Sequence, residues 1–438
     1  MPAPHLPPGP RSSLTQLRYL RDPFPWMVKL AQEYADPVTV PILGMGDMVL
    51  TWSPEGVRTV FSADPDTFVP GTNEALALIV GRSSLFMMSG AAHRRARKLL
   101  MPPFHGERMR AYGALMHDTA RRWAQGITPG VSAPVLPVTQ GITLDIIIEA
   151  IFGERDPARI SLLHKDILAI VAAFNPVIAT FKFAQREFGG VGPWARFRRR
   201  AEALEARMRA LMDEKRARPG DDILSLLLSV RDEDGAAMDD REVLEQLLTF
   251  VIAGHETTAT SLAWALYELH RAPEALGRLR EALANKRTPE EIAATPYLEA
   301  VVRETQRMHP PVPVVTRKLA RPLTLGAFAL PAGTTLGVGV FNAHHRAETF
   351  VEPFAFRPER FLTGAFSPFE YLPFGGGARR CVGWAFAEYE QKLALAALLD
   401  RGTYTLDEPA PVRNAFRIGT YGPETGVRLT LTARPHDG

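Results

Sequence analysis

The sequence predicts a mainly α-helical protein with a minor share of β-strand. Helical periodicity fills most of the chain between residues 92 and 285, and it returns twice before the C-terminus. Strand-like alternation is confined to short stretches at residues 38–52, at residues 318–340 and in the tail. No repeat, low-complexity linker or domain break interrupts this pattern, so we expect a single domain over residues 1–438.

The expected elements follow one another in a simple order. Residues 1–24 form a proline-rich segment, which precedes an amphipathic helix at 27–34 and a strand pair at 38–52. Helices are predicted at residues 92–100, 106–125, 143–152, 161–174, 193–217, 221–231 and 240–271. The last of these ends at Ala272, because Pro273 cannot continue it and opens the next helix in its first turn. Two more helices, at 296–309 and 382–400, flank short strands and proline-rich chain.

Composition excludes several classes of protein. Apolar residues make up 46% of the 438 residues and charged residues 23%, as in ordinary globular proteins. The pI is about 9.0, but the cations form no basic tract with interleaved aromatic residues, so no nucleic-acid partner is expected. A single cysteine excludes an intrachain disulfide and fits a reducing compartment. No apolar run reaches the ~20 residues of a membrane span, and no signal peptide is visible, so we expect a cytoplasmic protein without a membrane span.

The only cysteine, Cys381, stands in the stretch PFGGGARRCVG at residues 373–383. It lies one or two residues before the predicted last helix, whose first N–H groups and dipole favour a thiolate. Three glycines before it let a backbone segment or a flat cofactor come close, and Arg379 offers a positive charge to a carboxylate. Taken alone, a lone cysteine is a small buried apolar residue. A reactive nucleophile is the second interpretation, although no histidine or aspartate is adjacent.

The spacing within this stretch is specific. Phe374, Gly377, Arg379, Cys381 and Gly383 match F-x-x-G-x-R-x-C-x-G, which resembles the haem-binding loop of the cytochrome P450 superfamily of haem-thiolate monooxygenases. The resemblance implies that Cys381 is the proximal iron ligand, that Phe374 packs beside its sulfur and that Arg379 pairs with a haem propionate. It also implies the fold of a soluble bacterial P450, with haem b between the long central helix and the helix after the cysteine loop.

The long central helix carries the stretch AGHETT at residues 253–258. Polar groups in an apolar helix cost stability unless they are paired, and alone they indicate a salt-bridged Glu256 and packed threonines. The stretch also resembles a second signature of the same family, which implies that Glu256 and Thr257 manage protons for oxygen activation. Ala253 and Thr257 share one helix face, which the resemblance directs to the distal side of the haem. We expect His255 to point away from that face and to be structural.

Glu304 and Arg307 are three residues apart and therefore share a helix face. As a surface pair they would contribute only about 0.2–0.5 kcal/mol. In the family this pair is buried and joined by an arginine from a downstream segment, which matches PFAFRPERF and implies Arg360 as the third member. The resemblance assigns the triad a structural role in holding the cysteine loop.

Several cations, most of them before the central helix in the sequence, have two interpretations. His93 and Arg97 are four residues apart, and alone they indicate a solvated basic face. The resemblance implies that they reach the haem propionates together with Arg317. The remaining cations form either a solvated face or a basic proximal face on which a ferredoxin-type partner docks; they are Arg94, Arg95, Lys98 and Arg380.

By position in the family, apolar segments facing the distal haem are predicted to line the substrate pocket, although each could equally be core. They contribute Leu76, Leu78, Ile79, Leu85, Phe86, Phe174, Phe250, Ala253, Val312, Val314, Ile418 and Thr420. The lid is expected at residues 173–183, which include Phe174.

The reaction implied by the resemblance inserts one atom of O2 into a lipophilic small molecule, such as a terpenoid or a fatty acid. The other atom leaves as water and consumes two electrons and two protons. No dinucleotide-binding glycine motif is found, so the electrons are expected from NAD(P)H through a separate ferredoxin reductase and ferredoxin. We expect a monomer.

Three alternatives compete with this interpretation. The first is a haem-thiolate peroxygenase or isomerase, the second a non-catalytic haem sensor or carrier, and the third a helical binding protein without a cofactor. Glu256 and Thr257 argue against the first two, since peroxygenase-type relatives replace the pair and a sensor has no use for it.

Overall fold

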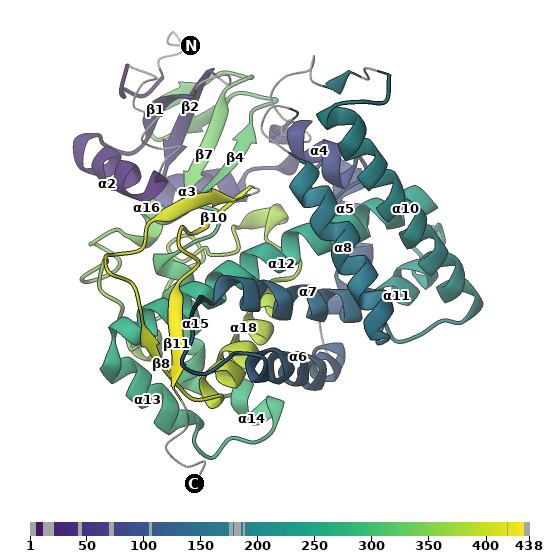
Figure 1. Ribbon diagram of the computed structural model, residues 1–438. Helices are drawn as coiled ribbons and strands as arrows, with labels where there is room; N and C mark the ends of the chain where they lie inside the picture. Colours follow the sequence, from purple (N-terminus) through teal and green to yellow (C-terminus); the bar gives the residue numbers. More distant parts are fainter. Residues whose placement is uncertain are drawn as a thin grey trace. The chain divides into compact units, whose positions relative to one another are not determined.

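The computed structural model describes residues 6–11, 22–42, 46–69, 74–104, 107–174, 178, 185–186, 189–417 and 419–432. The chain forms two compact units, and each is described by itself. Unit 1 comprises Met1–Val69, Gly113–Ile142 and Thr257–Gly438, and unit 2 comprises Pro70–Tyr112 and Thr143–Glu256. The predicted mainly helical fold with minor sheet is confirmed (Figure 1).

Unit 1 holds all the described strands. A four-stranded sheet has the order β1-β2-β7-β4, in which only the β2–β7 pair is parallel (Figure 1). Its strands are β1 (Val38–Ile42), β2 (Gly46–Thr51), β7 (Thr335–Gly339) and β4 (Val314–Lys318). The smaller sheets are formed by β3 (Ser132–Pro134), β5 (Leu323–Leu325), β6 (Phe328–Leu330), β8 (Thr403–Leu406), β9 (Asn414–Arg417), β10 (Thr420–Pro423) and β11 (Arg428–Thr432). The predicted N-terminal strand pair is confirmed, although residues 43–45 of its turn lie outside the described residues.

The helices that lie entirely in unit 1 are mostly short. They are α2 (Pro23–Glu33), α3 (Pro54–Ser62), α13 (Pro273–Leu283), α14 (Pro289–Ala293), α15 (Pro296–Met308), α16 (Val340–His344), α17 (Arg360–Thr363) and α18 (Trp384–Asp400). A shared apolar core joins the four-stranded sheet to α2, α3 and α16. Met27, Leu50, Val57, Leu336 and Val340 are among its almost fully buried members. Burying apolar surface between these layers supplies the main favourable free energy for this part of the fold.

Unit 2 is helical. It holds α4 (Glu74–Val80), α5 (Gly90–Leu100), α8 (Pro157–Ala173), α10 (Pro193–Ala217) and α11 (Ile223–Ser229). Buried residues of α10 recur at Leu204, Met208 and Leu211, which is the spacing of one helix face. This face packs on α8, and Arg207 of α10 pairs with Asp166 of α8 at 2.6 Å, so α8 and α10 lie side by side (Figure 1).

Three helices pass from one unit into the other: α6 (Glu107–Gln125), α7 (Leu136–Phe152) and α12 (Asp240–Arg271). The predicted bounds of α12 are confirmed, and Pro273 opens α13 as expected. Helix α7 begins at Leu136, seven residues before the predicted start at residue 143. Pro137 lies in the first turn, where a proline is tolerated. At Gly141 a Cβ would lie 2.3 Å from the Trp123 ring, so close packing explains the glycine.

The predicted acid–arginine triad lies in the core of unit 1. Arg307 donates from Nε and Nη2 to both carboxylate oxygens of Glu304, at 2.7 and 2.9 Å. Arg360 Nε donates to the same carboxylate at 3.1 Å. Glu304 and Arg307 are fully buried. Arg307 Nη1 also donates to the carbonyl oxygens of His344 and Pro353, at 2.8 and 2.7 Å, so α15 is fastened to the chain on either side of residue 350.

His344 extends this network toward the cysteine loop. Its Nδ1 lies 3.2 Å from the Arg307 carbonyl oxygen, and its Nε2 accepts a hydrogen bond from Leu372 N at 2.9 Å. Burial, together with the charge of Arg307, lowers the pKa of His344 to about 3. The neutral ring therefore holds one donor and one acceptor in fixed directions. Leu372 directly precedes the stretch 373–383, so the triad and the cysteine loop are joined through a single imidazole.

Removing one charge of the triad tests its contribution to stability. In Arg307→Met the buried Glu304 carboxylate loses two hydrogen bonds, and we expect the free energy of unfolding to fall by about 3–5 kcal/mol. Arg278→Met is the matched control, since Arg278 is 60% exposed and pairs with Glu359 at 2.9 Å. The control should lose no more than about 1 kcal/mol. Denaturant titration measures both variants, and equal losses would contradict a structural role for the triad.

Candidate active site

The cysteine loop of unit 1 is a short 3₁₀ turn followed by the start of α18. The turn spans Gly377–Arg379, and Cys381 N donates to Phe374 O at 3.0 Å, which closes the loop on itself. Helix α18 begins at Trp384, three residues after the cysteine rather than the one or two expected. The Cys381 side chain is exposed. A small thiol is most often buried, so an exposed one next to a helix N-terminus offers its sulfur to a ligand.

Gly377 is required by the backbone of this loop. Its φ is +63°, and a Cβ there would lie 2.1 Å from the carbonyl oxygen of Phe61 in α3. Any side chain would therefore push the loop away from α3. Gly383 is different, because a Cβ there would meet no described atom within 4 Å. The open space beside the Gly383 Cα is suited to a flat cofactor.

Two arginines of the predicted propionate site lie close together in unit 1. Burial, together with the nearby charge of Arg379, lowers the pKa of Arg317 in β4 to about 10. Burial also lowers the pKa of Arg379. Two half-buried cations that disfavour each other's charge are suited to an anionic ligand such as a pair of carboxylates. The cysteine, the open glycine and the two cations thus fit haem.

The signature of the central helix occupies a partly open stretch of α12. Ala253, Glu256 and Thr257 are half-buried, whereas most of the following residues up to Leu269 are buried. Helix α12 continues through the signature without a break. A half-buried carboxylate and hydroxyl in an otherwise buried helix are positioned to face a ligand. His255 is buried, and its Nε2 lies 3.7 Å from Glu256 Oε2.

Sequence reasoning missed a buried acid on α18. Glu390 is 2% exposed, and burial raises its pKa well above the ordinary value, while a hydrogen bond with Thr258 opposes that shift. The protonated form is therefore favoured, one residue along α12 from Thr257. The available signal was periodicity, since Phe386, Glu390 and Ala394 are spaced four apart on one buried helix face.

His93 and Arg97 of the predicted propionate set lie in unit 2, on α5. His93 is buried and Arg97 is half-buried, on adjacent turns of one face. The other members of the set, Arg317 and Arg379, belong to unit 1.

The basic face predicted for partner docking is partly neutralised. Arg95 lies 2.5 Å from Asp232, and Lys98 pairs with Glu233. Arg380 lies over the Trp384 ring at 4.4 Å. Ion pairing leaves less net positive charge around Arg95 and Lys98 in unit 2 than the run of cations in the sequence suggested.

The predicted pocket residues fall on several elements. In unit 2, Ile79 is buried on α4, Leu76 and Leu78 are half-buried beside it, and Phe250 contacts Phe104 edge-on at 5.1 Å. Phe174 caps α8 and lies 6.0 Å from the Phe197 ring. Most of the lid expected at 173–183 lies outside the described residues.

The pocket residues of unit 1 lie around β4 and β10. Val312 is exposed and Val314 is half-buried on β4. Thr420 on β10 is buried, and its Oγ1 has no hydrogen-bond partner among the described residues. Ile418 lies outside the described residues.

A polar clamp that the sequence did not reveal fixes the segment carrying Leu85 and Phe86. Gln246 of α12 accepts from Leu85 N at 3.0 Å and donates to Ser83 O at 2.5 Å, and Glu245 accepts from Ser83 N. Ser84 Oγ and Thr249 Oγ1 are 2.7 Å apart. These bonds hold the pocket segment against α12 within unit 2, while the Phe86 ring remains exposed.

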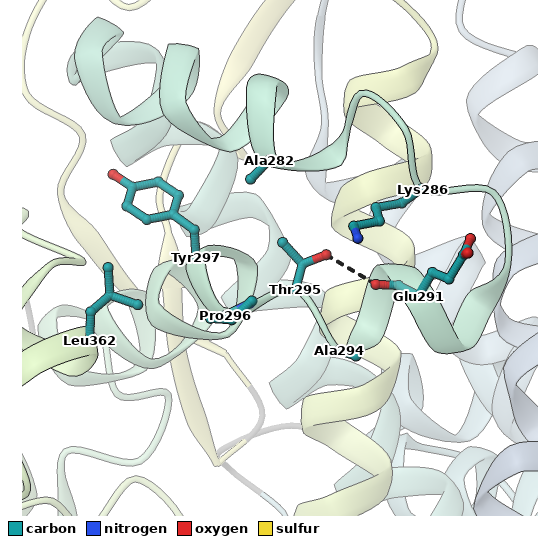
Figure 2. A pocket seen from close by; sticks show the side chains of 8 residues that line it. All are labelled: Ala282, Lys286, Glu291, Ala294, Thr295, Pro296, Tyr297 and Leu362. Atoms are coloured by element: carbon teal, nitrogen blue, oxygen red, sulfur yellow. Dashed lines mark hydrogen bonds between the residues drawn. The ribbon is translucent and has the colours of Figure 1, made fainter.

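One surface hollow lies apart from these residues. It has a volume of about 560 Å³ and is lined by residues of α13, α14, α15 and α17 and their connections, including Lys286, Thr295 and Tyr297. Figure 2 shows Thr295 donating to the Glu291 carbonyl oxygen at its edge. None of the predicted site residues lines this hollow, so it does not correspond to the candidate active site.

Comparisons with known proteins agree on one family. The family model for Cytochrome P450 matches residues 4–417. The chain is 33% identical over 435 residues to "Putative cytochrome P450 135B1" of Mycobacterium tuberculosis, covering 98% of this chain and 92% of that protein. It is 34% identical to "Putative cytochrome P450 137" of the same organism, covering 92% and 84%.

Solved structures show the same fold. The retinoic acid bound cyanobacterial CYP120A1 superposes with a TM-score of 0.85 at 22% identity, covering 98% of this chain and 99% of that one. The cytochrome P450DA heme domain gives a TM-score of 0.86 at 21% identity, covering 99% of each chain.

An open cysteine loop at the start of a late helix, beside a four-stranded sheet and a long apolar helix, defines the class of haem-thiolate proteins. The chain belongs to the cytochrome P450 family and is a cytochrome P450 monooxygenase. Within the described ranges, no single helix is both long and apolar enough to cross a membrane. One pair, Leu136–Phe152 and Pro157–Ala173, reaches that limit only when counted together across a 110° bend.

Two glycines of the cysteine loop provide a matched test of its geometry. Both have positive φ, but a methyl group at Gly375 would meet nothing within 4 Å, whereas at Gly377 it meets Phe61 O. Each alanine should cost about 1–2 kcal/mol for the left-handed backbone, and only Gly377→Ala should also displace the loop. We expect Gly375→Ala to keep its haem and Gly377→Ala to lose most of it, measured as haem per polypeptide. Equal haem content would contradict the close approach of the loop to α3.

Proposed function

We propose that this P450 binds haem b through the Cys381 thiolate and inserts one oxygen atom of O2 into a lipophilic small molecule. The observation that carries the proposal is the exposed Cys381 thiol in a glycine loop at the start of α18, with Arg317 and Arg379 half-buried in the same unit. Cys381 is the only cysteine in the sequence, so no other residue can supply a thiolate.

The residues of the loop hold the cofactor in distinct ways. Haem, when bound, supplies the iron at which O2 is reduced. The Cys381 sulfur would ligate that iron and supply electron density to it. Arg317, Arg379, His93 and Arg97 bind the propionates as cations or hydrogen-bond donors. Phe374 shields the sulfur.

Glu256 and Thr257 would supply the protons for this reaction. Conversion of O2 to one inserted oxygen and one water consumes two electrons and two protons. Glu256 is a carboxylate that accepts a proton from outside and releases it inward, and Thr257 holds a hydroxyl where it can donate to the reacting oxygen. Ala253, on the same helix face, leaves room beside them.

The substrate proposal is a lipophilic small molecule such as a terpenoid or a fatty acid. Apolar side chains on α4, α12 and β4, and in the clamped segment with Leu85 and Phe86, support it. One structural relative is titled as bound to retinoic acid, which is a lipophilic molecule.

Electrons are proposed to come from NAD(P)H through a ferredoxin reductase and a ferredoxin that docks on the proximal face. Arg94, Lys98 and Arg380 are the exposed cations of the proposed docking site. Since Arg95 and Lys98 are ion-paired, we expect a modest dependence of docking on ionic strength. A cytoplasmic monomer completes the proposal.

Isotope labelling tests the reaction class. Purified holoenzyme is supplied with NADPH, a surrogate ferredoxin and its reductase, and lauric acid or limonene as probes chosen by spin-state shift. The proposal predicts one atom of ¹⁸O from ¹⁸O2 in the product, dependent on the ferredoxin. A product labelled only from water, or no turnover with any ligand that shifts the spin state, would contradict it.

Loss of the Thr257 hydroxyl should uncouple electron use from product formation. In Thr257→Ala we expect NADPH oxidation to continue while hydrogen peroxide becomes the main product, because the donor to the reacting oxygen is gone. Thr257→Ser restores a hydroxyl and should recover coupling. Thr260→Ala is the matched control on the same helix, since Thr260 Oγ1 has no hydrogen-bond partner among the described residues. Fully coupled turnover in Thr257→Ala would contradict the role of Thr257 as a proton donor.

A further inference from the structure

Four polar side chains of unit 2 form a cluster beside the proposed acid. Asp145 lies on α7, His164 on α8, and His255 and Glu256 on α12. His164 Nε2 is 2.8 Å from Asp145 Oδ1, and His255 Nε2 is 3.7 Å from Glu256 Oε2. Thr143 Oγ1 on α7 donates to the His255 carbonyl oxygen at 3.1 Å, which fixes the helix backbone at this point. The cluster brings three elements to one position on α12.

One ring nitrogen of His255 lacks the hydrogen bond that a purely structural histidine would make. Its ring is 4% exposed, and its Nδ1 is buried without a hydrogen-bond partner among the described residues. Buried polar nitrogens in proteins are nearly always bonded, so such an atom calls for an explanation. His344 provides the contrast, because both of its ring nitrogens contact backbone groups. The open nitrogen of His255 remains available to a proton.

The charges around His255 suit proton transfer. Burial lowers the pKa of His255, Glu256 opposes that shift, and His164 adds to it. His164 is therefore close enough for its charge to act on His255. The groups facing His255 are Glu256 from its own helix, His164 from α8 and, through His164, Asp145 from α7. A neutral imidazole carries one donor and one acceptor nitrogen, so it can take a proton on one side and release one on the other.

The other end of the cluster reaches solvent. The side chains of His164 and Asp145 are 20% and 15% exposed. Their 2.8 Å contact lies off the line of a hydrogen bond, so the imidazole N–H is not locked to the carboxylate. His164 Nε2 is itself buried, so water reaches the pair through the exposed parts of the two side chains, whereas His255 is buried almost completely.

We propose that His164, assisted by Asp145, and His255 form a proton relay from solvent to Glu256. The inference rests on the proposed function and departs from the structural role expected for His255. Solvent protonates His164, and a proton passes from His164 to Nδ1 of His255 through intervening water. The proton on Nε2 of His255 then moves to the Glu256 carboxylate across a gap that a small rotation or one water closes. Reversal of the imidazole tautomer resets the ring, and no electrons move.

Three variants test the relay in the holoenzyme. His255→Gln keeps a polar side chain but cannot relay, and His164→Asn removes the outer group at a partly exposed position. His270→Gln is the matched control, because His270 is a half-buried histidine of α12 with one nitrogen unbonded among the described residues, but it faces Arg280 rather than an acid. Haem content and the absorbance spectrum establish that each variant is folded.

The first measurement is the rate of NADPH-driven O2 consumption with a surrogate ferredoxin and reductase. We expect His255→Gln to slow it about tenfold or more, the lower end of what positioned acid–base groups contribute, and His164→Asn severalfold, with a larger solvent isotope effect in both. Hydrogen peroxide-driven oxidation of guaiacol should be retained, since peroxide brings its own two protons. His270→Gln should match the wild type in both assays.

The second measurement does not depend on turnover. In the ferrous carbon monoxide form, ¹⁵N-imidazole NMR follows the pKa of His255, whose signals His255→Gln assigns. Removing His164 should raise that pKa, because a neighbouring positive charge is lost. Unchanged rates in His255→Gln and His164→Asn would overturn the relay. So would a pKa of His255 that stays the same when His164 is removed. A wild type without a haem spectrum would instead overturn the proposed function. If His255→Gln fails to fold, the rate and the solvent isotope effect of His164→Asn carry the test.

Discussion

The position of the cysteine loop depends on the hydrogen bonds that the buried Glu304 carboxylate accepts. It accepts hydrogen bonds from two guanidinium groups and from the backbone of Arg357 in a region without solvent. A buried charge is tolerated only when its partners satisfy it. Arg307 then bonds to His344, and His344 accepts from the backbone directly before the loop. The position of Cys381 is therefore set by a chain of hydrogen bonds that begins with the charged Glu304–Arg307 pair on α15.

This rigidity explains how an accessible thiol can serve as a ligand. A cysteine on a mobile loop would leave its sulfur without a fixed direction. Here the loop is closed by the bond from Cys381 N to Phe374 O and pressed against α3 at Gly377. Preorganised ligands lower the free-energy cost of ordering when a metal binds. Stability in this part of unit 1 and affinity for the cofactor are thus two consequences of one set of contacts.

Features of the fold that depend on local sequence patterns could be predicted from the sequence. The length and ends of α12 followed from apolar periodicity and Pro273, and the Glu304–Arg307–Arg360 contact followed from a family resemblance. Contacts made by residues distant in sequence were not readable. Glu390 beside Thr258, the Glu245–Gln246 clamp and the His164–Asp145 pair join helices by tertiary packing alone. The early start of α7 was also missed. Its Gly141 packs against the Trp123 ring, and no local pattern in the sequence reveals that contact.

Thiolate ligation by Cys381 is the central claim, and the absorbance spectrum of the reduced carbon monoxide complex tests it most directly. The account predicts a Soret band at the long wavelength typical of a haem thiolate for the native chain, and its loss in Cys381→Ser. A native chain that binds no haem, or a serine variant with an unchanged Soret band, would contradict the account.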